Sequence, residues 1–101
     1  MKKSKMLNDI LPFVKIIHHS SGRLRLDVSS KIKELDNLDE INLDDVFNIK
    51  GILDLKVNKL LGKITILYDD KLLAMSSFEN LLNSKNEDEI KLALKEFNIE
   101  D

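Results

Sequence analysis

The amino-acid sequence predicts an α+β fold in which helices cover one face of an antiparallel sheet. Apolar and polar residues alternate in three short segments, residues 24–28, 53–57 and 63–68, as they do in half-buried strands. Apolar residues recur at helical spacing after the first and the last of these segments. With 101 residues, of which 43% are hydrophobic, the chain can bury one core and is too short for two. We therefore expect a single domain over residues 1–101.

The first strand has the clearest pattern. Leu24, Leu26 and Val28 alternate with charged residues. The upstream residues 13–19 are also strand-like, and the segment 20–22 between them contains two serines and a glycine. This composition predicts a bulge or bend within one long strand, with a loop as the alternative.

A helical segment is expected next, capped by Ser29 or Ser30 and broken near Asn42. Its first apolar residues lie three apart: Ile32, Leu35 and Leu38. Gly51 ends this segment, and the strands at 53–57 and 63–68 follow it. The short connection at 59–62 ends in a glycine and predicts a hairpin.

Two further helices complete the prediction. The first covers residues 72–82, with Ser76 or Ser77 as its cap, and the second covers residues 86–97. The second helix has a capping box, either Ser84 with Glu87 or Asn86 with Glu89, and an apolar stripe. The stripe consists of Ile90, Ala93, Leu94 and Phe97.

This order of elements is the βαββα core of the ferredoxin-like sandwich, with helices on one face of the sheet. The predicted core covers about residues 13–83, and the helix at 86–97 is an addition at its C-terminal side. A fourth strand, the bracketed element in βαββα(β), would have to come from residues 98–101. If these residues form no strand, they fray.

Composition excludes several classes of function. The chain has no cysteine, so it has no disulfide, no thiolate nucleophile and no Cys-x-x-Cys metal site. It contains no P-loop, no dinucleotide-binding fingerprint and no nucleophile elbow, and we expect a protein that is not an enzyme. A net charge of -2 and the lack of paired exposed aromatic residues argue against nucleic acid as a partner.

No apolar run is long enough to cross a bilayer, so no transmembrane segment and a cytoplasmic location are expected. The lysines at positions 2, 3 and 5 are interpreted as a solvated end.

Three segments resemble one bacterial family. Residues 19–26 read HSSGRLRL, residues 49–58 read IKGILDLKVN and residues 62–69 read GKITILYD. Together they resemble the cysteine-less heavy-metal-associated-like domains, over about residues 14–82. The chain departs from the family pattern at turn positions Ser21, Lys50 and Leu61.

The resemblance implies a ferredoxin-like fold and an accessory or regulatory role in metal or iron handling. It also implies binding to a partner protein, such as a metal-transport or iron-storage system, or to a metal-containing ligand. The alternative is an assembly module that docks through its sheet edge or its C-terminal helix. A homo-oligomer is left open.

His18 and His19 are the chain's only histidines and its candidate ligands for a transition metal or for haem. Consecutive strand residues point to opposite faces, so the two imidazoles can share one metal only if a bulge turns the backbone before Gly22. Ordinary packing is the alternative for both side chains.

Arg23 and Arg25 are the only arginines among 16 basic residues, and they lie on one face of the predicted strand. Their guanidinium groups can hold a carboxylate, a phosphate or a propionate. The alternative is an exposed sheet face on which they pair with acids such as Asp54.

An acidic group around the first predicted helix is interpreted as a solvated surface rather than a cation site. Its members are Asp36, Asp39, Glu40, Asp44 and Asp45.

Overall fold

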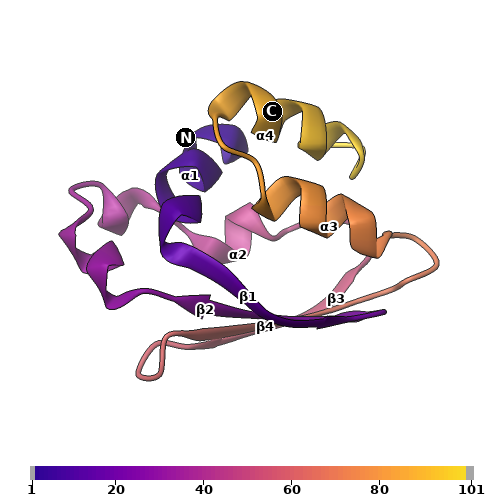
Figure 1. Ribbon diagram of the computed structural model, residues 1–101, viewed down its shortest axis with the longest axis horizontal. Coiled ribbons are helices and arrows are strands. Elements are labelled where there is room, and N and C mark those ends of the chain that lie inside the picture. Colours follow the sequence, from indigo (N-terminus) through magenta and orange to yellow (C-terminus); the bar gives the residue numbers. More distant parts are fainter. Residues whose placement is uncertain (1, 100–101) are drawn as a thin grey trace.

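Within residues 2–99, the part of the chain that the computed structural model describes, four α-helices lie on one face of a four-stranded antiparallel sheet (Figure 1). The strands are β1 (Val14–Ser20), β2 (Arg23–Val28), β3 (Ile52–Asn58) and β4 (Lys63–Tyr68). The helices are α1 (Lys3–Ile10), α2 (Leu43–Val46), α3 (Met75–Leu82) and α4 (Glu87–Lys95). Short 3₁₀ segments are η1 (Leu11–Phe13), η2 (Ser30–Glu34) and η3 (Leu38–Glu40). The predicted α+β class with helices on one face is confirmed.

The strand order is β1-β2-β4-β3, and each neighbouring pair is antiparallel. Strands β2 and β3 therefore run parallel with β4 between them, which is the split βαβ arrangement of ferredoxin-like folds. The fourth strand, β1, lies before this unit in the chain and not after it. Asn98 lies in a turn and Ile99 lies outside any strand, whereas residues 100 and 101 of the predicted fourth strand lie outside the described residues.

The prediction of one long strand over residues 13–28 is wrong, and the alternative of a loop is correct. Ser20 pairs with Arg23, so Ser21 and Gly22 form a tight turn between two antiparallel strands. Gly22 has a φ of 86°, a conformation that other residues adopt only with strain. A bulge does exist, but it lies earlier in β1, where the register shifts between Ile16 and His18.

The first predicted helix is also corrected. The crossover from β2 to β3 contains two 3₁₀ segments and only one short α-helix. Its apolar residues lie three apart, and this spacing matches the three residues per turn of a 3₁₀ helix. The expected break at Asn42 is the start of α2, because Asn42 Oδ1 accepts hydrogen bonds from the backbone N–H groups of Asp44 (2.9 Å) and Asp45 (3.3 Å).

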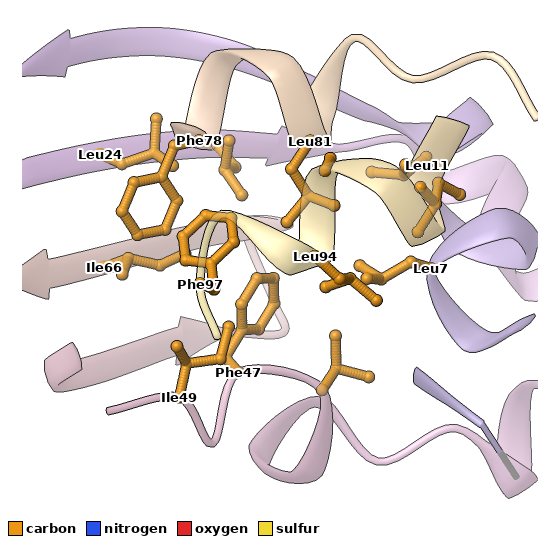
Figure 2. Packing of buried hydrophobic residues seen from close by; sticks show 14 of the residues in the cluster. Leu7, Leu11, Leu24, Phe47, Ile49, Ile66, Phe78, Leu81, Leu94 and Phe97 are labelled. Carbon is orange, nitrogen blue, oxygen red and sulfur yellow. The ribbon is translucent and has the colours of Figure 1, made fainter. Parts of the chain in front are cut away.

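Helix α1 was not predicted, because its lysines were interpreted as a solvated end. Met6, Leu7 and Ile10 of α1 are buried, and α1 packs on α4. Figure 2 shows Leu7 close to Leu94 of α4. The apolar stripe of α4 is buried as well, so one hydrophobic cluster extends from Met6 to Phe97, beyond the segment 13–83.

Two of the three predicted helix caps form. Ser29 Oγ accepts a hydrogen bond from the backbone N–H of Lys31 (3.2 Å) at the start of η2. Asn86 Oδ1 accepts a hydrogen bond from the backbone N–H of Glu89 (2.9 Å), and the Glu89 carboxylate accepts one from the backbone N–H of Lys85 (3.1 Å). Helix α3 begins after Ala74, without a side-chain cap. Ser77 lies inside α3 and donates to Glu96 instead (3.2 Å).

Candidate functional site

The two histidines lie on opposite faces of the sheet. In the register of β1 with β2, His19 pairs with the buried Leu24, and His18 pairs with Arg25. His19 therefore faces the helices, and His18 lies on the uncovered face. The bulge in β1 precedes both residues and does not bring the two imidazoles together. Among residues 2–99 there is no cluster of three or more His, Asp or Glu side chains that could hold a metal ion.

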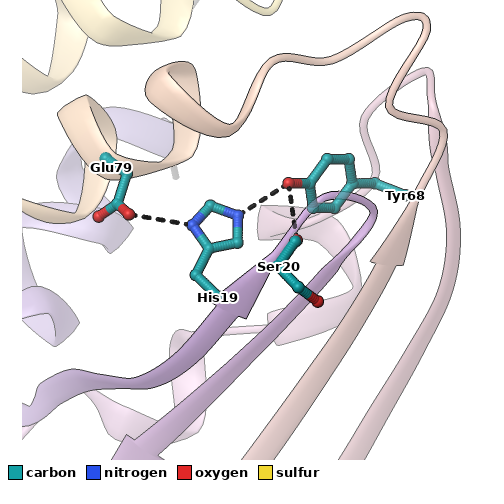
Figure 3. Close-up of polar contacts among 4 residues, drawn as sticks. All are labelled: His19, Ser20, Tyr68 and Glu79. Carbon is teal, nitrogen blue, oxygen red and sulfur yellow. Dashed lines mark hydrogen bonds and ion pairs between the residues drawn. The ribbon is translucent and has the colours of Figure 1, made fainter.

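The His19 side chain is only 3% exposed and is hydrogen-bonded through both ring nitrogens (Figure 3). Nδ1 lies 3.2 Å from Glu79 Oε1, and Nε2 lies 2.8 Å from the Tyr68 hydroxyl. A carboxylate can only accept a hydrogen bond, so we assign the ring proton to Nδ1, which leaves Nε2 to accept from the Tyr68 O–H. The ring of Phe78 packs edge-on against the imidazole, at an interplanar angle of 88°.

This network connects β1 to β4 and α3. Burial raises the pKa of the Tyr68 hydroxyl, and the carboxylates of Asp70 and Glu79 raise it further, although the backbone of Gly22 opposes the change. Tyr68 therefore stays protonated and keeps donating at neutral pH. In this arrangement neither nitrogen of His19 is free to bind a metal. The geometry agrees with the packing role that was the alternative for this residue.

Sequence reasoning missed Tyr68 and Glu79 as partners of His19. Glu79 lies 60 positions away in the chain, and no motif connects the two. Tyr68 was predicted only as the last residue of the strand at 63–68. The one available signal was the alternation in β4, which places Tyr68 on the same face as Ile64 and Ile66.

The uncovered face of the sheet carries most of the remaining predicted site residues. Its register positions alternate with the buried residues of β2 and β4, so their side chains point away from the face that the helices cover. We call this surface the open face. Its basic residues are Lys15, Arg23, Arg25, Lys56 and Lys63. Its acidic residues are Asp27 and Asp54, of which Asp27 pairs with Lys63 at 2.5 Å.

Neither arginine forms an ion pair with any residue in the described range 2–99. The expected pairing with Asp54 does not form: Leu67 of β4 lies between Arg23 and Asp54 in the register, so their backbones are two strand spacings, about 10 Å, apart. Both guanidinium groups are therefore available to an external anion.

Arg25 lies at the centre of a polar row that crosses the open face. His18 of β1 is its neighbour on one side and Thr65 of β4 on the other, and Lys56 of β3 follows Thr65. A guanidinium group can bind a carboxylate or a phosphate with two parallel hydrogen bonds, and a hydroxyl and an ammonium group can add donors to the same anion. The row has the chemistry of an anion-binding surface.

Fold and surface together define a small ferredoxin-like domain with an uncovered, basic sheet face. No family model matches the chain, and no curated protein and no solved structure shows significant similarity to it. In the described part of the chain no helix is both long and apolar enough to span a membrane. The predicted acidic group, which includes Asp36 and Glu40, is exposed along the crossover between β2 and β3.

Proposed function

We propose that this protein is a small non-enzymatic accessory or regulatory domain whose open face binds an acidic segment of a partner protein in the bacterial cytoplasm. The observation that carries the proposal is the pair of arginines, Arg23 and Arg25, which have no acidic partner among residues 2–99 and lie on a face that no helix covers. The chain as a whole has a net charge of -2, so this basic face is a local feature. Local charge of this kind attracts acidic partners and orients them.

The choice of arginine supports a specific contact rather than general solubility. Lysine supplies the other basic residues of the chain, and arginine occurs only in β2. Arginine has a rigid planar group with donors that match a carboxylate, and it loses less water on binding than lysine does. The sequence resemblance to cysteine-less heavy-metal-associated-like domains suggests the context of metal or iron handling, with a metal-transport or iron-storage system as the partner.

An acidic peptide can test the proposal directly. Isotope-labelled protein is titrated with a glutamate-rich peptide and followed by NMR. We expect shift changes on the open face around Arg25 and Thr65, and binding that weakens as salt is added. The double substitution Arg23→Ala with Arg25→Ala should weaken binding by about tenfold or more, because both charge-assisted contacts are lost.

Two exposed lysines of α4, Lys91 and Lys95, provide a matched control. Replacing both with alanine removes the same charge from the chain but leaves the open face intact. If this control weakens peptide binding as much as the arginine double substitution does, net charge explains the binding and the proposed surface is wrong. Shift changes confined to the helices would also contradict the proposal.

A metal-containing ligand is the second candidate, and His18 is the observation that favours it. His18 is exposed and lies beside Arg25, so one imidazole and the arginines could hold haem through its iron and its propionates. Titration calorimetry with iron, zinc, copper and haem tests this candidate. Binding should be lost in His18→Ala. No binding to the wild type, or unchanged binding in His18→Ala, would remove it.

Docking through the C-terminal helix has less support. Ile90, Leu94 and Phe97 are each at most 3% exposed, so the stripe that suggested this role forms part of the core. Deletion of residues 86–101 should therefore unfold the domain. The edge strands β1 and β3 remain open to another strand, but bulges near Ile17 and Leu53 interrupt both edges. Such bulges hinder regular strand addition.

A further inference from the structure

The turn between β3 and β4 exposes two adjacent leucines. Leu60 is 93% exposed, more than any other large hydrophobic residue in the described range 2–99, and Leu61 is 64% exposed. Single exposed leucines are common on soluble proteins, but two neighbours at the end of a hairpin form a continuous apolar tip. This tip projects beyond the sheet on the side away from the helices (Figure 1).

Lysines surround the tip. Residues 56–63 include Lys56, Lys59 and Lys63 and contain no acidic residue. Lys63 is paired with Asp27 of β2, and no carboxylate among residues 2–99 forms an ion pair with Lys56 or Lys59. In a chain with more acidic than basic residues, the hairpin therefore combines an apolar end with positive charge directly behind it.

Two backbone groups at the tip are already hydrogen-bonded within the protein. The N–H of Leu61 donates to Asn58 Oδ1 (3.1 Å), and the carbonyl of Gly62 accepts from the N–H of Val28 (2.8 Å). A segment that enters the boundary of a bilayer must satisfy such groups internally, because hydrocarbon offers no partners. The leucine side chains can thus leave water without uncovering these backbone groups.

We propose that the hairpin tip docks on the surface of an anionic membrane. Leu60 and Leu61 enter the boundary between headgroups and acyl chains, and the lysines contact lipid phosphates. The charge around the tip favours this occupant, and a convex tip suits a flat lipid surface. The contact is small, so binding is reversible and depends on anionic lipid. This proposal goes beyond the proposed function and uses the hairpin tip, whereas the proposed function uses Arg23 and Arg25.

Sedimentation with lipid vesicles tests the proposal. We expect the full chain to bind vesicles of phosphatidylcholine with about one-third phosphatidylserine, to bind pure phosphatidylcholine at least about tenfold more weakly, and to dissociate as salt is added. The double substitution Leu60→Ser with Leu61→Ser should reduce binding by about tenfold or more. Leu92→Ser is the matched control, because Leu92 is 63% exposed on α4 and should be neutral.

A tryptophan at the tip reports insertion itself. The chain contains no tryptophan, so Leu60→Trp introduces a single tryptophan, whose emission is distinct from that of Tyr68. Its emission should shift to shorter wavelength with the anionic vesicles and become shielded from a water-soluble quencher. A wild type that does not bind these vesicles would overturn the proposal and point to a groove on a protein instead. Equal binding by the serine double variant, or an unshifted tryptophan in bound protein, would overturn it as well. The double substitution Arg23→Ala with Arg25→Ala leaves the tip intact. Peptide binding, which tests the proposed function, can therefore be lost while vesicle binding, which tests the tip, is retained.

Discussion

Replacing Tyr68 with phenylalanine should destabilise the protein, because it leaves a buried hydrogen-bond acceptor without its partner. The change removes the hydroxyl that lies 2.8 Å from His19 Nε2 and keeps the ring that packs on Phe78 at 4.4 Å. The His19 side chain is 3% exposed, so its Nε2 would lose its partner with almost no access to water. A buried acceptor left without a partner costs about 1–3 kcal/mol. Each kcal/mol should lower the melting temperature by about 4–8 °C in a domain of this size.

Urea unfolding followed by circular dichroism measures the change. A double-mutant cycle with His19→Phe separates the hydrogen bond from general packing effects. His19→Phe alone removes the Nε2 acceptor and leaves the Tyr68 hydroxyl only the backbone carbonyl of Ser20, at 3.5 Å, whereas the double substitution removes both polar groups. We therefore expect the double variant to be less destabilised than the sum of the single variants, by about 0.5–3 kcal/mol. His18→Phe on the open face is the control and should stay within about 0.5 kcal/mol of the wild type. The reasoning fails if Tyr68→Phe matches the wild type or if the two substitutions are additive.

Three further predictions concern stability. Burial raises the pKa of Tyr68 above its usual value of 10.0, so the tyrosine of the unfolded state loses its proton first as the pH rises. The free energy of unfolding should therefore fall above about pH 10. Urea titrations should find this loss reduced in Tyr68→Phe. Gly62→Ala should lower the free energy of unfolding by about 1–3 kcal/mol, because Gly62 has a φ of 65° and a Cβ would lie 2.7 Å from the carbonyl oxygen of Val28. A thermal melt equal to that of the wild type would contradict this prediction. Asn86→Ala should cost about 0.5–2 kcal/mol through loss of the cap of α4, and Asn86→Ser should restore most of it in the same assay.

Strands β2 and β4 could be predicted because each has one buried face, whereas a bulge in β3 leaves Leu53 71% exposed. The alternation of buried and partly exposed residues along β4, from Lys63 to Tyr68, matches the pattern in the sequence. The turn at Gly22 could not be distinguished from a bulge by local pattern, since both use a glycine. Its identity depends on whether the flanking strands pair with each other, which is a tertiary property.

Helix α1 was not predicted, although its pattern is present in the sequence. Met6, Leu7 and Ile10 have the spacing of one helical face, but the lysines around them suggested a solvated end. Their burial depends on α4, about 80 residues away in the chain. The division of His18 and His19 between two faces did follow from strand geometry. The partners of His19 did not, because packing of α3 on the sheet determines them.

The contact between α1 and α4 also constrains when the chain can fold. Ser4 Oγ donates to Glu87 (3.4 Å) across a separation of 83 residues. During synthesis α1 is made before α4, so the part of its apolar side that packs on α4 stays uncovered until α4 has been made. Pairings between distant segments form slowly, and exposed apolar surface in partly made chains promotes aggregation. The contact between α1 and α4 is therefore among the last parts of the core to be completed.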